Sequence, residues 1–232
     1  MTGVPGPDEA GGRPGTDEVF AAVESGDEPR VRSLVAERPE LASARDDAGL
    51  PVVLAARYRN QLGIVEALLA ADPELDVFTA AALGHTERLA ELLDDDPAAV
   101  DAVAVDGFRP LQLAAFFGQL DAARLLLERG APVDAVSGND AGLRALHSAV
   151  AGRHVEVVAL LLGAGADPGP RQRGGFTPLM AAALHGDEPI VRALLAAGAD
   201  VTARSDDGRD AATMADEGAH AELAARLRAL AG

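Results

Sequence analysis

The 232-residue chain contains no cysteine and no tryptophan, and aromatic residues make up only 3% of it. The absence of cysteine excludes a disulfide framework and thiolate chemistry. With so few aromatic rings, the core must consist of alanine, leucine and valine, which suit closely packed helices better than a large β-sandwich. No apolar run reaches the ~18 residues that indicate a membrane-spanning helix. We therefore expect a helical protein in the cytoplasm.

Positive charge is also scarce, because 37 acidic residues stand against 20 basic ones and the net charge is −17. Nucleic acids and anionic membranes attract basic surfaces, so both are poor partners for this chain. The acid excess has two interpretations: it keeps an apolar-rich protein in solution, or it favours a basic partner. Every basic residue other than histidine is arginine, and alanine is abundant. This bias is typical of GC-rich coding and predicts a bacterial source.

A short phrase recurs along the chain: small apolar residues, a glycine with a polar neighbour, then a leucine-rich run. Its clearest copies are Ala80–Glu87, Ala114–Asp121 and Ala182–Asp187. The glycine position returns about every 33–35 residues, with one shorter step of about 24, and such a period predicts a stacked solenoid. The positions are Gly26, Asn60, Gly84, Gly118, Arg153, Gly186 and Ala219.

One copy, residues 175–203, indicates how the unit is built. Thr177 and Pro178 suit the start of a helix, because threonine caps the free backbone N–H groups and proline is tolerated in the first turn. Gly186 ends this helix, and residues 188–197 carry the apolar stripe of a second one. Gly198 then supplies a left-handed residue at the helix end. The unit is therefore a pair of helices followed by an extended loop.

These residues resemble an ankyrin repeat, whose pattern runs Gly-x-Thr-Pro-Leu-His-x-Ala-Ala, Gly-His-x-Glu-Val-Val, Leu-Leu-Leu and Gly-Ala-Asp. Further matches are Gly107–Ala115, Leu125–Ala131, His154–Val158 and Gly165–Asp167. The resemblance covers about residues 17–230. It implies an all-α solenoid of helix-turn-helix units joined by short β-hairpin loops, with seven units of which the first and last are caps. We expect a disordered leader over residues 1–16 and the repeat domain over residues 17–232.

The early joints depart from this pattern. Between Asn60 and Gly84 the spacing shortens, because residues 72–77 run almost directly into the next helix. The hairpin loop at this third joint is therefore expected to be missing or vestigial. Joints at Pro39 and Pro97 also lack the Gly-Ala-Asp sequence.

No pattern in the sequence indicates an enzyme. By the resemblance, His85, His154 and His220 occupy a position that hydrogen-bonds the backbone, and His147 and His185 also have places in the repeat. None is paired with another ligand at the spacing of a zinc site, and the serines and glycine pairs lack nucleophile-elbow and phosphate-loop contexts. We predict no catalytic residue, no metal and no cofactor. An enzyme would instead gather several titratable groups with perturbed pKa values in one cleft.

The resemblance implies that a partner protein binds the concave face, which consists of loop tips and the exposed side of each first helix. Most of the few aromatic residues fall at the variable positions of this face, and exposed aromatic groups mark interaction sites. The alternative is that these rings fill gaps between the loops. The predicted partner-binding residues are Leu50, Tyr58, Arg59, Leu83, Phe108, Phe116, Phe117, Leu143, Phe176 and Leu184.

The sequence therefore predicts a monomeric scaffold that binds another protein, whose identity it does not reveal. The alternative function is an inhibitor or immunity-like accessory protein whose acidic surface covers a basic site on a specific enzyme. That alternative predicts one tight complex that is sensitive to salt.

Overall fold

The computed structural model describes residues 14–232, which form two compact units divided after Leu75. Residues 1–13, and with them most of the predicted leader, lie outside the described residues. Helix α1 begins at Pro14. Each unit is described by itself below.

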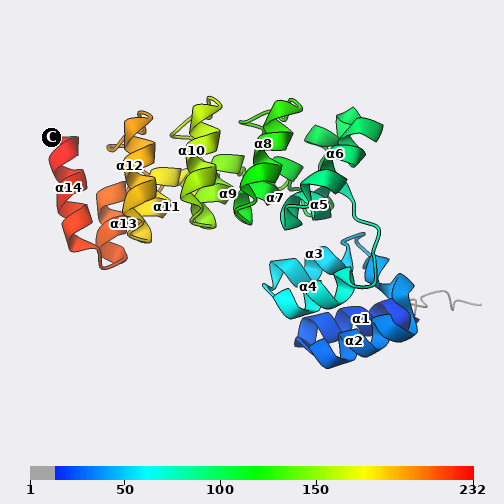
Figure 1. Ribbon diagram of the computed structural model, residues 1–232. Helices are drawn as coiled ribbons and strands as arrows, with labels where there is room; N and C mark the ends of the chain where they lie inside the picture. The colour runs from blue at the N-terminus through cyan, green and yellow to red at the C-terminus, as the bar shows by residue number, and fades with distance from the viewer. Residues whose placement is uncertain (1–13) are drawn as a thin grey trace, which may run out of the picture. The chain divides into compact units, whose positions relative to one another are not determined.

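Unit 1, residues 14–75, contains two helix pairs (Figure 1). The elements are α1 (Pro14–Ser25), α2 (Glu28–Glu37), the 3₁₀ helix η1 (Pro39–Ser43), α3 (Val52–Tyr58) and α4 (Leu62–Leu69). Val19, Val31, Leu34 and Leu54 are almost fully buried in this unit. Residues 72–76, which lead to the next helix, form neither a turn nor a helix.

Unit 2, residues 76–232, contains five further helix pairs, which stand side by side in chain order (Figure 1). The pairs are α5 (Val77–Leu83) with α6 (Thr86–Asp95), α7 (Pro110–Phe116) with α8 (Leu120–Glu128), α9 (Ala145–Ala151) with α10 (Val155–Gly163), α11 (Pro178–Leu184) with α12 (Glu188–Ala196), and α13 (Ala211–Glu217) with α14 (Ala221–Ala231). Two 3₁₀ helices, η2 (Pro97–Asp101) and η3 (Arg173–Gly175), lie in the connections. We call the first helix of each pair the inner helix and the second the outer helix.

The recurring glycine position is the turn between the two helices of a pair. All seven of its residues have a positive φ, from +55° at Asn60 to +73° at Gly84 and Gly118. Glycine adopts this left-handed conformation without the steric cost that a β-carbon brings. The period in the sequence therefore reflects one tight turn repeated along the chain.

Small inner-helix residues and large outer-helix residues form one continuous core in unit 2. Ala80, Ala114 and Ala149 have no accessible surface, so neighbouring inner helices approach closely. The outer helices contribute Leu89, Leu126, Leu161 and Leu194, all without accessible surface. This repetition explains how a core with few aromatic residues is filled.

The loops between pairs are tight turns closed by one or two backbone hydrogen bonds. Ala104 N donates to Phe108 O over 2.8 Å, and Ser137, Gln172 and Ser205 start the next three loops in the same way. Among the described residues the only β-bridge joins Arg45 and Pro51 in unit 1. The predicted all-α solenoid with short hairpin-like loops is confirmed. Within residues 14–232, no helix is both long and apolar enough to cross a membrane.

Candidate protein-interaction surface

The ten predicted partner-binding residues divide between the two units. Leu50, Tyr58 and Arg59 belong to unit 1, and the remaining seven belong to unit 2. In unit 1, Leu50 and Tyr58 are half-buried. Arg59 is exposed, and its Nη2 lies 3.9 Å from Glu24 Oε1. We therefore consider the seven residues of unit 2 as a surface of their own.

The end of inner helix α7 carries two adjacent aromatic rings. Phe116 is 41% exposed, whereas Phe117 is half-buried. Their ring centres lie 5.0 Å apart at an interplanar angle of 80°. This edge-to-face contact orients the exposed ring against its partly buried neighbour.

The backbone beneath Phe116 is held by the next repeat. His154 Nε2 lies 3.1 Å from Phe116 O, and a carbonyl can only accept, so the histidine donates. Glutamine makes the equivalent bond elsewhere, from Gln61 Nε2 to Val23 O and from Gln119 Nε2 to Ala82 O. Of the three histidines expected to bond the backbone in this way, His154 does so. No such bond is present for His85 or His220 within residues 14–232.

Phe108 and Leu143 lie where their loops enter the inner helices, and both are half-buried. Their backbones are fixed: Phe108 O accepts from Ala104 N, and Leu143 O accepts from Gln112 Nε2 over 2.8 Å. The remaining predicted leucines lie at the ends of inner helices, with Leu83 half-buried and Leu184 36% exposed.

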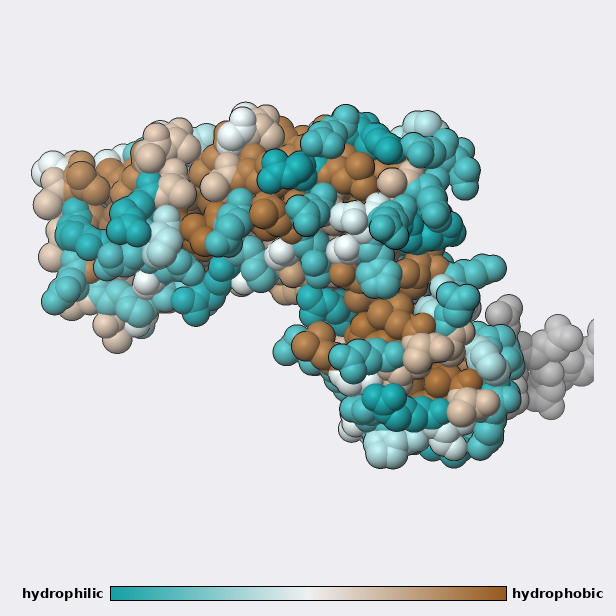
Figure 2. Space-filling view, viewed as in Figure 1, coloured by the Kyte–Doolittle hydropathy of each residue, from teal (hydrophilic) through white to brown (hydrophobic). Residues whose placement is uncertain are grey.

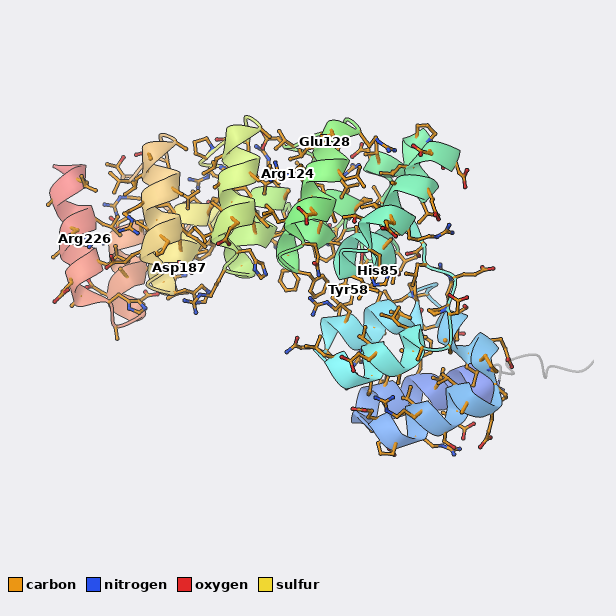
Figure 3. All side chains as sticks on the ribbon, viewed as in Figure 1. Tyr58, His85, Arg124, Glu128, Asp187 and Arg226 are labelled. Carbon is orange, nitrogen blue, oxygen red and sulfur yellow. The ribbon has the colours of Figure 1, made fainter. Side chains whose placement is uncertain are left out.

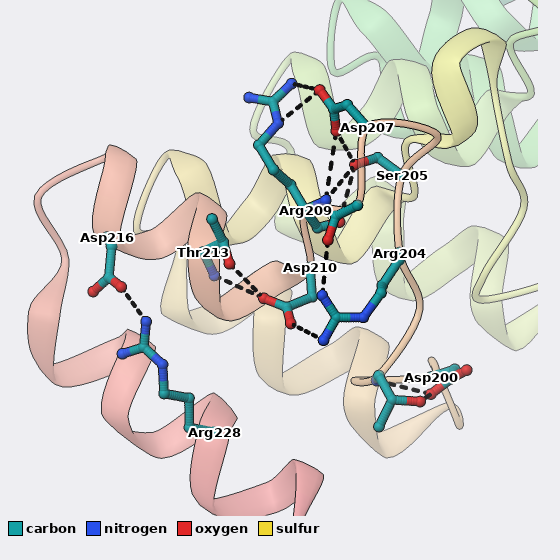
Figure 4. A network of polar contacts seen from close by, with 11 residues as sticks. Asp200, Arg204, Ser205, Asp207, Arg209, Asp210, Thr213, Asp216 and Arg228 are labelled. Carbon is teal, nitrogen blue, oxygen red and sulfur yellow. Dashed lines mark hydrogen bonds and ion pairs between the residues drawn. The ribbon is translucent and has the colours of Figure 1, made fainter.

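Phe176 is less available than the sequence suggested. Its half-buried ring packs against the core, and the guanidinium of Arg209, from the next repeat, lies 5.2 Å from the ring centre. Arg209 also forms an ion pair with Asp207 (Figure 4) and another with Glu217. The cation–π contact ties Phe176 to a network within the chain.

Sequence reasoning missed three exposed valines on the loops. Val105 is 60% exposed, Val103 48% and Val136 45%. No signal in the sequence indicated their exposure, because residues 102–105 read Ala-Val-Ala-Val and do not alternate between apolar and polar side chains. On the face seen in Figure 2, apolar surface is interspersed with hydrophilic residues along unit 2.

Most arginines of the described residues are engaged in ion pairs within the chain. Several of these pairs join successive repeats, such as Arg153 with Asp187 at 3.0 Å and Arg226 with Glu188 at 3.3 Å (Figure 3 labels Asp187 and Arg226). Many acidic residues form no ion pair within residues 14–232. Glu87, Asp121, Glu156 and Glu222, all exposed in the first turns of outer helices, belong to this group. The charge left for a partner is therefore mostly negative.

Several of the titratable groups with shifted pKa values gather at the last repeat. Asp207, Arg209, Asp210 and Arg228 lie at the last repeat, together with Arg204, in the contacts of Figure 4. Hydrogen bonds from Arg209 and Ser205 lower the pKa of Asp207, and Asp207 raises the pKa of Arg209. Such shifts hold both groups in their charged forms, whereas acid–base catalysis needs pKa values near neutrality. Within residues 14–232, no three His, Asp or Glu side chains are grouped so as to hold a metal ion.

Comparisons with known proteins agree with this architecture. A family model described as ankyrin repeats (3 copies) matches residues 52–137, 77–172 and 133–205. Ankyrin repeat and SAM domain-containing protein 6 of Mus musculus is 30% identical over 174 residues, which are 72% of this chain and 20% of that protein. Neurogenic locus notch homolog protein 4 of Homo sapiens is 37% identical over 138 residues, 59% of this chain and 7% of that protein. Protein phosphatase 1 regulatory subunit 27 of Homo sapiens is 46% identical over 67 residues, 29% of this chain and 44% of that protein. The chain spans less than half the length of each of these three relatives.

Proposed function

The chain belongs to the ankyrin-repeat family, and we propose that it is a non-catalytic protein that binds a protein partner through one face of unit 2. Ankyrin repeats generally mediate protein–protein interactions. The binding face consists of loop tips and the ends of inner helices. Its residues are Leu83, Phe108, Phe116, Phe117, Leu143, Phe176 and Leu184.

Phe116 carries the proposal. Its ring is 41% exposed on a backbone that His154 and α7 hold in place. A large side chain presented by a rigid element loses little conformational freedom on binding, so it suits the centre of an interface. Leu184, 36% exposed, provides a second apolar contact, and the half-buried Phe108, Leu143 and Phe176 surround these two.

Leu50, Tyr58 and Arg59 of unit 1 form a second proposed contact area. We also propose that all seven helix pairs are ankyrin repeats and that the protein is a cytoplasmic monomer. The similarity to a protein named as a regulatory subunit supports a role without catalysis. The mass of the purified chain in solution, by sedimentation, tests the monomeric state.

A second candidate function is an inhibitor or immunity-like accessory protein that covers a basic site on a specific enzyme. The observation that favours it is the distribution of charge, since the arginines are largely paired within the chain and acidic groups such as Glu87 and Asp121 are exposed. Salt would weaken such a complex strongly, whereas it would weaken an apolar interface only slightly.

The test is affinity capture from the native cell, with mass spectrometry of the proteins that bind the wild type and the Phe116→Ser variant. We expect Phe116→Ser to reduce recovery of the specific partner at least about tenfold, a typical loss for a central aromatic anchor. The matched control is Leu230→Ser, because Leu230 is 62% exposed on α14 and is not one of the proposed binding residues of this face. Undiminished capture by a folded Phe116→Ser variant, or loss only with Leu230→Ser, contradicts the proposal.

A further inference from the structure

The last two outer helices of unit 2, α12 and α14, border a shallow groove of about 420 Å³. These two helices are packed less closely than any earlier two successive outer helices of the unit, and Figure 1 shows them side by side at its end. The groove shares no residue with the binding face proposed above. It is therefore a separate surface of unit 2.

The residues that line the groove follow the period of a helix on both of its sides. Positions i, i+3, i+4 and i+7 lie on one face of a helix. Two such stripes face the groove, and a third helix fits between them because its side-chain ridges can settle between those of its neighbours. The stripes are Glu188, Val191, Arg192 and Leu195 on α12, and Leu223, Arg226, Leu227 and Leu230 on α14.

The floor and the rim of the groove are apolar. Val191, Leu223 and Leu227 form the floor and are at most 3% exposed. Leu195 and Leu230 are the last residues of the two stripes. Leu195 is half-buried, and Leu230 is 62% exposed. An apolar side chain placed between these two leucines would remove their remaining surface from water, which favours binding.

The charge at the groove is positive, in contrast to most of the surface. Arg226 is balanced, because it pairs with Glu188 of the other helix at 3.3 Å (Figure 3 labels Arg226). Arg192 is exposed and lies one helical turn after Glu188, yet it forms no ion pair in the part of the chain that the structure describes. Among the described residues that line the groove, Glu188 alone is acidic. One positive charge is therefore left for an occupant.

We propose that this groove binds an amphipathic helix of a partner protein, with apolar side chains between Leu195 and Leu230 and a carboxylate against Arg192. The inference goes beyond the proposed function, because it concerns a second surface. The net charge of −17 repels an acidic helix only weakly, since physiological salt screens exposed charges beyond about 8 Å. In contact, a carboxylate gains a charge-assisted hydrogen bond from the guanidinium, and a neutral helix does not.

Charge also disfavours a second copy of the chain as the occupant. Twofold pairing would place the same groove of each copy against the other. Arg192 and Arg226 of one copy would then lie near the same two arginines of the other, with only the already paired Glu188 side chains as counter-charges. Each copy would also carry a net charge of −17, which opposes association. An acidic helix meets neither obstacle at the groove itself.

The probe for the test is a synthetic peptide of about 15 residues, the length at which an alanine-rich helix becomes stable in water. It carries leucines at i, i+4 and i+7, glutamates on both sides of that stripe and alanine elsewhere. Binding is followed by the amide and methyl resonances of the isotope-labelled full chain, and we expect shifts at Leu195, Leu227 and Leu230. A version with glutamine in place of glutamate should bind at least about threefold more weakly. A version with a central proline should bind at least about tenfold more weakly, because proline breaks the helix.

Reversal of one charge tests the role of Arg192. Arg192→Glu should weaken binding of the glutamate peptide at least about fivefold, and this variant should prefer a peptide with lysine in place of glutamate. The matched control is Arg124→Glu, which should leave binding unchanged. Arg124 is the fifth residue of α8, as Arg192 is of α12. It is also exposed and without an ion pair among residues 14–232.

Two further variants separate the groove from the face that carries Phe116. Leu230→Ser should weaken binding of the peptide at least about fivefold, whereas Phe116→Ser should leave it unchanged. Failure of this proposal is therefore distinguishable from failure of the proposed function, and Leu230→Ser remains a control for the other face.

Several outcomes would overturn the proposal. These are equal effects of Arg192→Glu and Arg124→Glu, equal binding of the glutamate and proline peptides, and shifts confined to residues outside the groove. Dimers in sedimentation without peptide, with shifts at Leu230 on dilution, would identify a second copy as the occupant and would overturn it as well.

Discussion

His147 connects the start of α9 to the loop that follows α10. Its Nδ1 accepts a hydrogen bond from Arg144 N, and its Nε2 lies 3.1 Å from Pro170 O. Because the carbonyl can only accept, Nε2 carries the proton and the ring is neutral. Gln112 makes the same pair of contacts one repeat earlier, with an oxygen that accepts from Arg109 N and a nitrogen that donates to loop carbonyls. The position therefore requires one acceptor and one donor.

Substitution of His147 tests this requirement. We expect His147→Leu to lower the free energy of unfolding by about 1–3 kcal/mol, because a buried N–H and a buried carbonyl lose their partner. His147→Gln should cost less than about 1 kcal/mol, since Gln112 shows that glutamine fits an equivalent place. Urea unfolding of the two variants measures the difference. Equal losses for leucine and glutamine would show that the hydrogen bonds contribute little.

The pH dependence of stability gives a second prediction about His147. Burial lowers the pKa of His147 from 6.5 to about 4, so the folded protein binds this proton less readily than the unfolded chain does. The stability associated with the neutral ring is complete above pH 6.5 and is lost as the pH falls toward 4. The loss should reach about 3 kcal/mol at pH 4.

The matched control for this effect is His147→Gln, which has no group titrating at that position. Between pH 7 and pH 4, the unfolding free energy of the wild type should fall further than that of the glutamine variant. Carboxylates titrate in both proteins, so their effect cancels in the difference. Parallel curves for the two proteins would contradict the pKa assigned to His147.

The helix pairs were predictable from the sequence because their turn imposes a local requirement. Gly84, Gly118 and Gly186 mark a left-handed residue wherever the chain passes from an inner to an outer helix. Arg153 and Ala219 adopt the same conformation although neither residue type favours it. Only their spacing from the other turn positions, one repeat length apart, pointed to them.

The exposure of the site residues was not predictable in the same way, because it depends on neighbours from other repeats. Phe116 and Phe117 are adjacent and chemically identical, yet their surroundings leave one exposed and the other half-buried. The guanidinium over Phe176 comes from Arg209, in the following repeat.

Two isosteric substitutions of threonine should change stability in opposite directions. Thr79→Val removes a buried hydroxyl that has no partner, so it should be neutral or raise the free energy of unfolding by up to about 1 kcal/mol. Thr177→Val removes the hydroxyl that caps α11 by accepting a hydrogen bond from Met180 N. This substitution should lower the free energy of unfolding by about 1 kcal/mol. Thermal and urea unfolding of both variants measure the two effects. A clear loss of stability with Thr79→Val would indicate that this hydroxyl has a hydrogen-bond partner after all.

Relief of backbone strain at Ala219 should stabilise the last helix pair. Ala219 has φ = +63° between α13 and α14, where its β-carbon is disfavoured. Ala219→Gly removes that carbon, and we expect it to raise the free energy of unfolding by about 0.5–1 kcal/mol despite the greater freedom that glycine gives the unfolded chain. The control is Ala225→Gly, since Ala225 is exposed inside α14. This substitution should lower the free energy of unfolding by about 1 kcal/mol, because glycine is a poor helix former. The same chemical change is made at two positions six residues apart. Changes of opposite sign in the free energy of unfolding, measured in urea, therefore identify the backbone conformation as the cause. A loss of stability at both positions would refute the strain at Ala219.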